Sequence, residues 1–377
     1  MTTFADMGLS PRILDRLSSK GFTDPTPIQS QAIPHILNGR DIMGLAQTGT
    51  GKTAAFGLPI LHHLWHVGTK PEDRSARALI LAPTRELASQ ITENLLIFSR
   101  DTHLKVALVV GGVSINTQIK RLQKGTDVLV ATPGRLLDLL NRRAITLSDA
   151  RYLVLDEADQ MLDMGFIHDL RKISTHLPEE RQTMMFSATM PKLMGELAET
   201  YLNSPLRVQV SPPGKAADKV TQEVHFMQQG DKGQHLKKLL GNHREERALV
   251  FSRTKHGAEK LKKGLVAVGF AAASIHGNKS QGQRTRALEE FKSGELKILV
   301  ATDVAARGID IPQVMYVYNY DLPNVPENYV HRIGRTARAG AEGTAIAFCS
   351  PDEMGELRAI EKVLKSTIKI SHGKPWD

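Results

Sequence analysis

Three arginines share one short stretch of the sequence, HRIGRTARAG at residues 331–340. Arg332, Arg335 and Arg338 are spaced by three, a spacing that can place side chains on one side of a helix. Like charges gathered in this way cost free energy unless an anion compensates them, and no acidic run lies beside them in the sequence. The stretch predicts an anionic ligand, and a solvated basic helix end is the alternative that it leaves open.

A phosphate ligand is predicted by AQTGTGKT at residues 46–53, which follows the apolar DIMGLA and precedes the helical pattern AAFGLPILHHL. Gly49 and Gly51 permit the tight turn in which backbone N–H groups converge on phosphate oxygens. Lys52 would reach the β- and γ-phosphates, and the Thr53 hydroxyl would bind Mg²⁺. Ala46 stands where the general pattern has glycine, so a chance glycine-rich turn is the alternative. The other predicted phosphate contacts are Thr48 and Thr50.

Carboxylates end the apolar strand pattern in RYLVLDEADQ, residues 151–160. Adjacent acids at a strand end suit a magnesium site, in which Asp156 would hold the ion, through water. Glu157 would orient and deprotonate an attacking water molecule. A polar strand end on a solvated surface is the alternative for this stretch alone. Together with the phosphate loop, the acids predict a magnesium-dependent nucleoside triphosphatase.

An adenine contact is a weaker prediction from GFTDPTPIQSQAI, residues 21–33. The amide of Gln29 carries donors and an acceptor, and it can therefore match one edge of adenine. Phe22 could stack on the ring. From residue type alone, an ordinary polar residue at a helix start is the better interpretation of Gln29.

These motifs need a parallel sheet to bring them together. Short, nearly continuous apolar runs alternate with amphipathic stretches, which predicts parallel sheets covered by helices on both faces. Ligands of such sheets bind at the carboxyl ends of the strands, where each motif lies. The predicted strands are 77–83, 105–112, 127–133, 151–158, 182–189, 248–254, 271–277, 297–303, 314–321 and 343–350.

Two domains are expected, because 377 residues exceed one ordinary core. The stretch VSPPGKAADK has two prolines, a glycine and no periodicity, so we assign the linker to residues 208–217, between domains 1–207 and 218–377. The tetrapeptide LVAT ends a predicted strand in each half, which suggests two related domains. The net charge of +9 is uneven: the first 207 residues carry 23 basic against 21 acidic residues, and the remainder 26 against 19.

Composition narrows the class of protein further. A basic balance suggests a polyanionic partner, and with only 5% aromatic residues a nucleic acid would be held mainly by its backbone. The single cysteine, Cys349, excludes an internal disulfide, and its apolar strand predicts a buried position. No apolar run reaches membrane-spanning length, and the N-terminus does not have the pattern of a secretory signal. We expect a cytoplasmic protein with no membrane partner.

At this point the motifs resemble those of the DEAD-box ATP-dependent RNA helicases, and within them the bacterial RhlE-type subgroup. DEAD at 156–159 follows AQTGTGKT, and the resemblance covers almost the whole chain. The other ordered matches are GFTDPTPIQ (21–29), PTRELA (83–88), GG (111–112), TPGR (132–135), SAT (187–189), VFSRT (250–254), ATDVAARGID (301–310) and HRIGRTAR (331–338). The resemblance implies two RecA-like domains, with ATP and RNA as ligands.

The resemblance also implies roles for single residues. Phe22 and Gln29 would recognise adenine, Asp310 the ribose, and Arg335 and Arg338 would act as arginine fingers on the γ-phosphate. Ser187, Thr189, Asp159 and His331 would couple ATP hydrolysis to RNA. The implied RNA contacts are Pro83, Thr84, Arg85, Gly112, Thr132 and Arg135 in the first domain, and Arg253, Gln281, Arg284, Thr302 and Asp303 in the second. The family usually has glycine where Ala337 stands.

The implied activity is RNA-stimulated hydrolysis of Mg-ATP, coupled to local unwinding of short RNA duplexes or remodelling of RNA–protein complexes. The implied partners are single-stranded and short duplex RNA, with ribosomal or RNA-decay proteins among the candidates, and we expect a monomer. A basic C-terminal tail often follows this pattern; none follows SHGKPWD, so we expect a helicase core. Two rivals stay open: a DNA translocase, and an ATP-gated RNA clamp or scaffold with little unwinding.

Overall fold

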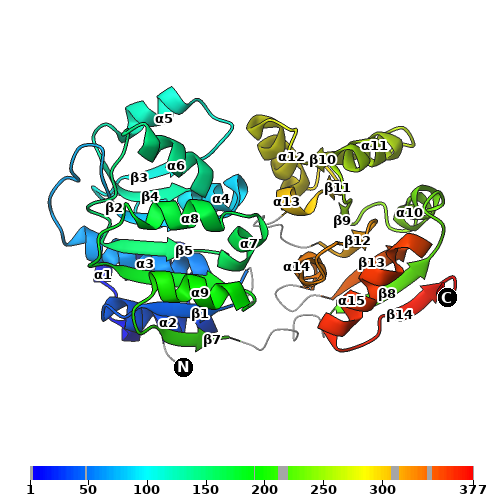
Figure 1. Ribbon diagram of the computed structural model, residues 1–377, viewed down its shortest axis with the longest axis horizontal. Coiled ribbons are helices and arrows are strands. Elements are labelled where there is room, and N and C mark those ends of the chain that lie inside the picture. Colours follow the sequence, from blue (N-terminus) through cyan, green and yellow to red (C-terminus); the bar gives the residue numbers. More distant parts are fainter. Residues whose placement is uncertain are drawn as a thin grey trace. The chain divides into compact units, whose positions relative to one another are not determined.

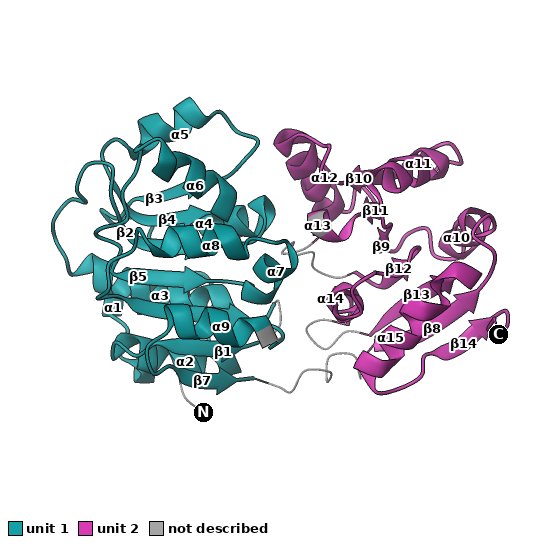
Figure 2. Cartoon of the chain, in the orientation of Figure 1, with its two compact units in different colours: residues 1–212 teal, residues 213–377 magenta. Residues whose placement is uncertain are grey.

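The computed structural model describes residues 3–46, 49–190, 192–210, 220–306, 314–337 and 342–376. The chain divides into two compact units, Met1–Pro212 and Pro213–Asp377 (Figure 2). The division falls inside the segment that the sequence predicts as linker. Each unit is described by itself below.

A seven-stranded sheet forms the centre of the first unit (Figure 1). Its order is β3-β4-β2-β5-β6-β1-β7, and every neighbouring pair is parallel. The central strands are buried on both faces, as continuous apolar strands of a covered parallel sheet should be. The strands are β1 (Ile42–Leu45), β2 (Ala76–Leu81), β3 (Val106–Val109), β4 (Thr126–Ala131), β5 (Tyr152–Leu155), β6 (Gln182–Ser187) and β7 (Leu206–Gln209).

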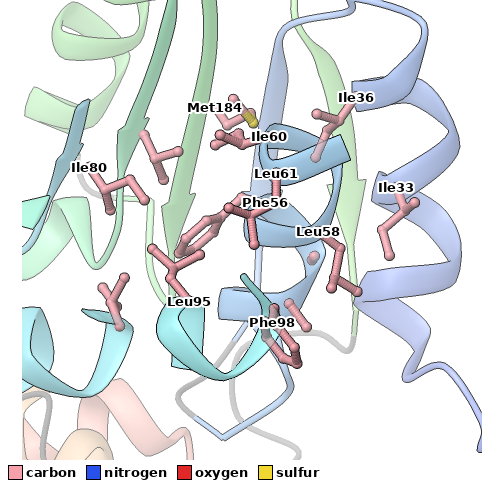
Figure 3. Close-up of a cluster of buried hydrophobic side chains, with 14 of the residues drawn as sticks. Ile33, Ile36, Phe56, Leu58, Ile60, Leu61, Ile80, Leu95, Phe98 and Met184 are labelled. Atoms are coloured by element: carbon pink, nitrogen blue, oxygen red, sulfur yellow. The ribbon is translucent and has the colours of Figure 1, made fainter. Parts of the chain in front are cut away.

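Helices cover both faces of this sheet, because successive strand residues point to opposite sides. Ile80 of β2 packs into the cluster with Phe56 of α3 and Leu95 of α4 (Figure 3). Its neighbour Leu81 belongs to the cluster that contains residues of α6, α8 and α9. The short helix η1 (Ala5–Met7) opens the described chain. The α-helices are α1 (Pro11–Ser19), α2 (Pro27–Leu37), α3 (Lys52–Trp65), α4 (Arg85–Phe98), α5 (Ile115–Leu122), α6 (Pro133–Asn141), α7 (Ala158–Asp163), α8 (Ile167–Ser174) and α9 (Lys192–Tyr201).

The second unit repeats this topology. Its sheet has the order β10-β11-β9-β12-β13-β8-β14, which is the order of the first sheet when each strand number is advanced by seven. The two LVAT tetrapeptides end β4 and β11, which hold the same place in the two sheets. The strands are β8 (Val220–Phe226), β9 (Ala248–Phe251), β10 (Ala272–Ile275), β11 (Ile298–Ala301), β12 (Tyr316–Asn319), β13 (Gly343–Cys349) and β14 (Lys369–His372).

Two helix layers also enclose the second sheet. One buried cluster joins α10 and α11 to one face, and another joins α12, α13, α14 and α15 to the opposite face. Cys349 lies fully buried in β13, as its apolar context predicts. The helices are α10 (Lys232–Gly241), α11 (Lys255–Val266), α12 (Gln281–Ser293), α13 (Asp303–Ala306), α14 (Glu327–Ile333) and α15 (Met354–Leu364), with the short η3 (Pro351–Glu353) before α15.

All ten predicted strands are present, but each ends one to three residues before its predicted end. The excess residues include parts of the motifs PTRELA, TPGR, DEAD and SAT, which lie beyond the strands at the carboxyl edge of the sheet. The strands β1, β7, β8 and β14 were not predicted, because they are short or partly exposed and lack a long apolar run. Strand β7 runs two residues into the predicted linker, and residues 211–217 of that linker lie outside the described part of the chain.

Candidate nucleotide and RNA sites

The phosphate loop joins β1 to α3 in the first unit. Gly49 and Gly51 have φ angles of +85° and +91°, a left-handed conformation that other residues adopt only with strain. Lys52 begins α3 and is buried, and its Nζ donates to the carbonyl oxygen of Ala46 at 3.2 Å. Thr53 follows in the first turn of α3, and Thr50 precedes Gly51. Thr48 lies outside the described residues.

Gln29 secures this loop from α2. Its Oε1 accepts a hydrogen bond from the Thr26 backbone N–H at 2.9 Å, and its Nε2 donates to the Gly51 carbonyl at 3.1 Å. A Cβ atom at Gly51 would overlap the Gln29 amide, so Gln29 can occupy this position only because residue 51 is glycine. Since Nε2 carries two hydrogens, Gln29 can donate to a ligand as well as to the loop. Its contact with adenine stays a prediction.

Phe22 presents an exposed ring on the approach to α2. The ring is 42% exposed and meets Phe98 edge-on, with centroids 5.7 Å apart. An aromatic ring that is partly open to solvent is suited to stacking on a purine.

The acid pair lies at the end of β5, next to the phosphate loop. Asp156 and Glu157 are each 1% exposed, and Asp156 Oδ1 lies 3.6 Å from Lys52 Nζ. Burial raises the pKa of Asp156 to about 6; Lys52 opposes this rise and Glu157 adds to it. Glu157 has a φ angle of +52°, an uncommon conformation for a residue with a side chain. Such strain at a buried acid is typical of a functional site.

Asp159 links the acid motif to the SAT motif at the end of β6. Its Oδ2 accepts hydrogen bonds from the backbone N–H groups of Ala188 and Thr189, at 3.2 and 2.8 Å, and from Thr189 Oγ1 at 2.8 Å. The Ser187 hydroxyl donates to the Thr189 carbonyl at 2.6 Å, and the Ser187 carbonyl accepts from Ala46 N–H at 2.9 Å. A hydrogen-bonded path therefore runs from the acids through SAT to the phosphate loop.

Strand order separates these residues from the predicted RNA contacts of the first unit. The nucleotide motifs follow the neighbouring strands β5, β6 and β1, whereas the RNA candidates follow β3, β4 and β2. Residues far apart in the sequence thus share one sheet edge, in two adjacent halves. The RNA candidates at the ends of β2, β3 and β4 are Pro83, Thr84, Arg85, Gly112, Thr132 and Arg135.

Arg85 and Gly112 depend on each other within that half. Gly112 has a φ angle of +77°, and a Cβ atom there would overlap the Arg85 guanidinium. Arg135 Nη1 donates to the carbonyl of Val113 at 2.9 Å, so a second arginine holds the same loop. Thr84 and Thr132 are the N-terminal capping positions of α4 and α6, which begin at this edge.

In the second unit, Arg253 follows β9 and lines a cavity of about 700 Å³ with Thr254, Lys237 and Lys260. Its Nη2 donates to Glu353 Oε1 at 2.9 Å and to the Leu322 carbonyl at 3.2 Å. An RNA contact from Arg253 would therefore be made by a guanidinium that already has an acidic neighbour.

The remaining candidates of the second unit gather at the ends of β10 and β11. Gln281 begins α12, and Arg284 is buried one turn later. Thr302 directly follows β11, and Asp303 begins α13. Both Asp303 carboxylate oxygens accept hydrogen bonds from Arg332, so this acid is an ion-pair partner, a role that the sequence did not predict.

Two arginines of the stretch HRIGRTARAG are buried in the second unit. Arg332 is 2% exposed and Arg335 is 3% exposed, and both line a small pocket with His331. No acidic run lies beside these arginines in the sequence, but Arg332 has an acidic partner in Asp303, which is 29 positions away. Arg338 and Asp310 lie outside the described residues.

Comparison with known proteins agrees with this geometry. Residues 26–197 match the family model for the DEAD/DEAH box helicase, and residues 231–340 match that for the helicase conserved C-terminal domain. The chain is 45% identical over 377 residues to the ATP-dependent RNA helicase CshA of Listeria monocytogenes, covering all of this chain and 72% of that relative. It is 45% identical to the DEAD-box ATP-dependent RNA helicase CshA of Bacillus subtilis, covering 96% of this chain and 72% of the relative.

The chain belongs to the DEAD-box family of ATP-dependent RNA helicases.

Solved DEAD-box structures extend the likeness to the fold. Saccharomyces cerevisiae Dbp5 bound to RNA and ADP-BeF3 matches with a TM-score of 0.86 at 33% identity, covering 99% of this chain and 96% of Dbp5. Mss116p bound to single-stranded RNA and AMP-PNP matches with a TM-score of 0.89 at 30% identity, covering 100% of this chain and 80% of Mss116p. The predicted fold class, two RecA-like domains, is confirmed, as is the predicted activity of an RNA-stimulated ATPase and helicase.

Two buried polar residues of this DEAD-box helicase lie outside the sequence motifs and were not predicted to have structural roles. Gln118 of α5 is buried, and its amide exchanges two hydrogen bonds of 3.1 Å with the backbone of Val110, before the glycine pair. Lys232 is fully buried and donates to Glu353 and to the Tyr320 carbonyl. In sequence, an amide or lysine within a helix looks like surface, and only the tertiary fold reveals its partner. Among the described residues no helix is long and apolar enough to cross a membrane.

Proposed function

We propose that this helicase hydrolyses Mg-ATP at the carboxyl ends of β1 and β5, and that RNA binding at the neighbouring strand ends triggers the turnover. The observation that carries the proposal is the buried group of Lys52, Asp156 and Glu157, which combines a phosphate-binding ammonium with two carboxylates. Glu157 acts as the general base for the attacking water. Lys52 stabilises the negative charge of the phosphates.

The donor set fits Mg²⁺. The carboxylate of Asp156 and the hydroxyl of Thr53 are hard oxygen ligands, which this ion prefers. The raised pKa of Asp156 means that burial penalises its charge more than Lys52 compensates it, and a divalent cation would offset that cost. When bound, the ion would neutralise charge on the β- and γ-phosphates.

The RNA site is proposed to read the backbone. Thr84, Arg85 and Arg135 are donors suited to phosphate and sugar oxygens, and such contacts carry no information about base sequence. We therefore propose sequence-independent unwinding, with preference for RNA over DNA through 2′-hydroxyl contacts.

The second unit is proposed to complete the catalytic site. Arg335 belongs to this unit, whereas Lys52 and Glu157 belong to the first. A reaction that needs all three requires the units to come together, and we propose that ATP and single-stranded RNA together favour that closed state. A strand bent in the closed state no longer fits a regular duplex, which then opens locally. Hydrolysis and phosphate release reverse the closure.

Finer assignments are retained here as predictions. We propose that Asp310 contacts the ribose, that Arg338 is a second finger, and that His331 couples the units. We further propose a cytoplasmic monomer that acts with ribosomal or RNA-decay proteins. The RhlE-type subgroup also stays a prediction, and the relatives reported above are named CshA.

The test compares ATP hydrolysis with Mg²⁺ in the absence of nucleic acid, with single-stranded RNA and with single-stranded DNA. We expect strong stimulation by RNA alone, with loss of turnover in Glu157→Gln and Arg335→Ala. Glu157→Gln should still bind RNA and an ATP analogue, because the amide keeps the shape of the carboxyl group. Equal stimulation by DNA would favour a translocase. Full biological function of Glu157→Gln would favour the scaffold.

A further inference from the structure

Arg332 is held within the second unit by an ion pair and by several hydrogen bonds. It lies on α14 and is 2% exposed. Its Nε donates to Asp303 Oδ1 at 2.6 Å and its Nη2 donates to Asp303 Oδ2 at 2.8 Å. This is the bidentate arrangement in which an arginine holds a carboxylate with fixed orientation.

The rest of the guanidinium is also occupied. Its Nη1 donates to Asn319 Oδ1 at 3.0 Å and to the Asp321 carbonyl at 2.7 Å, and its Cζ lies over the Phe251 ring, 4.8 Å from the ring centroid. A phosphate could take Arg332 only by breaking these bonds and leaving the carboxylate of Asp303 without its cation. Removing one partner of a buried ion pair is costly, so Arg332 is unsuited to act as a third arginine on the nucleotide.

The residues that Arg332 joins come from both functional motifs of the second unit. Asp303 follows Thr302 at the end of β11, where the proposed function expects RNA. Arg335 lies one turn beyond Arg332, and its backbone N–H donates to the Arg332 carbonyl at 3.1 Å. Asp303, His331 and Arg335 line the same small pocket as Arg332. The ion pair therefore fixes the start of the RNA-facing α13 against the segment that carries the proposed finger.

We propose that Arg332 is a positioning residue that transmits RNA occupancy at the end of β11 to Arg335, through its bidentate pair with Asp303. This inference rests on the proposed function and adds a residue that acts through another. A rigid pair moves as one body, so a shift of Thr302 and Asp303 on RNA binding also shifts α14. Without the pair, the two segments respond independently, and RNA no longer determines where Arg335 lies.

The test is a double-mutant cycle with Arg332→Gln and Asp303→Asn, alone and together, in the full chain. Three quantities are measured: binding of a fluorescent ATP analogue without RNA, the polyuridylate concentration that gives half-maximal stimulation, and the stimulated kcat. We expect each single variant to lower kcat by about tenfold, within the usual range of coupling energies, and to raise the half-stimulating RNA concentration. Analogue binding should stay within about twofold of wild type, because Lys52 and Gln29 lie in the first unit. The double variant should be no worse than the poorer single variant.

Two further variants separate positioning from folding. Arg332→Lys keeps the charge but cannot make the bidentate contact, so it should melt near the wild-type temperature and still show the raised RNA requirement. Arg286→Gln breaks an exposed ion pair with Glu290 on α12 and should change none of the three quantities.

Additive effects in the cycle, or wild-type kinetics in Arg332→Lys, would overturn the inference. Weakened analogue binding by Arg332→Gln, with an unchanged RNA requirement, would also overturn it and assign Arg332 to the nucleotide. These outcomes bear on the inference only if RNA stimulates ATP hydrolysis by the wild-type chain. A wild-type chain that RNA does not stimulate would overturn the proposed function and the inference together, and the two failures are therefore distinguishable.

Discussion

Asp159 and Thr189, thirty residues apart in the sequence, are joined by two hydrogen bonds of 2.8 Å, from the backbone N–H and the hydroxyl of Thr189 to one carboxylate oxygen. The pair joins the ends of β5 and β6, which are neighbours in the first sheet. We expect these bonds to pass a displacement of the acid motif to the SAT motif, because hydrogen bonds to a charged acceptor are stronger than neutral ones.

Thr189→Val tests this link, since valine keeps the shape and removes the hydroxyl. A hydrogen bond to a charged group contributes about 1.5–3 kcal/mol, so we expect the RNA-stimulated kcat to fall by about tenfold or more. Binding of an ATP analogue should be unchanged. Thr200→Val, which removes an exposed hydroxyl on α9, is the matched control. Equal kinetics in the two variants would contradict a coupling role for Thr189.

Gly51→Ala tests the contact between the phosphate loop and Gln29. The substitution places a Cβ atom against the Gln29 amide and adds the strain of a left-handed backbone. Gly39→Ala introduces the same kind of strain at φ +74°, but no atom lies within 4 Å of the Cβ that the alanine adds. Both variants should lose about 1–2 kcal/mol of stability from the backbone, and only Gly51→Ala should weaken ATP-analogue binding, by about tenfold or more.

Titration of the analogue into both variants gives the answer. If Gly39→Ala weakened binding as much as Gly51→Ala, general destabilisation would explain the loss, and the specific contact with Gln29 would not.

Acid should destabilise the second unit through a histidine cluster. His235 of α10 lies against His225 of β8 and His372 of β14, with a ring-nitrogen distance of 2.8 Å between His225 and His235. Burial, then His225, His372 and Lys238, lower the pKa of His235 to about 4. Burial also lowers the pKa of His225, against the opposing effect of Glu223. The unfolded chain, with an ordinary histidine pKa near 6.5, therefore binds more protons than the folded unit between about pH 4 and 6.5.

The sign follows from that difference: stability is present above about pH 6.5 and is lost as the pH falls towards 4. Denaturant unfolding at several pH values, followed by Trp376 fluorescence in a Trp65→Phe background, measures it for the second unit. His235→Gln should flatten the dependence, and His256→Gln, at an exposed position on α11, should leave it unchanged. A dependence of the same steepness in both variants would show that another group is responsible.

Lys232→Met should destabilise the second unit strongly. Lys232 is fully buried against Glu353, which also accepts from Arg253 and from the backbone N–H of Leu322. Removing the ammonium leaves a buried carboxylate with reduced compensation, at a cost of about 3–5 kcal/mol in unfolding free energy. Lys238→Met, at an exposed position on the same helix, should change it by about 0.5 kcal/mol or less. A small effect of Lys232→Met in the same Trp376 assay would mean that Arg253 alone compensates Glu353.

The sequence by itself determined the chemistry and the class of fold. AQTGTGKT, DEAD and SAT each carry a local signal, because a phosphate loop needs glycines next to a helix start and a metal site needs acids at a strand end. The apolar runs likewise predicted ten strands, since a strand buried on both faces must be apolar throughout. Exposed β14 and the short strands β1 and β7 carry no such signal, and they were missed.

Only the tertiary structure decided which side chains meet. Three arginines with equal spacing look alike in sequence, yet Arg332 is bound to Asp303 from another strand end. Lys232 and Gln118 also look like surface residues and are buried against distant partners. The physical reason is that strand order, and not sequence order, sets the neighbours at the edge of a parallel sheet. A polar residue becomes a ligand contact, an ion-pair partner or a solvated group according to the strands beside it.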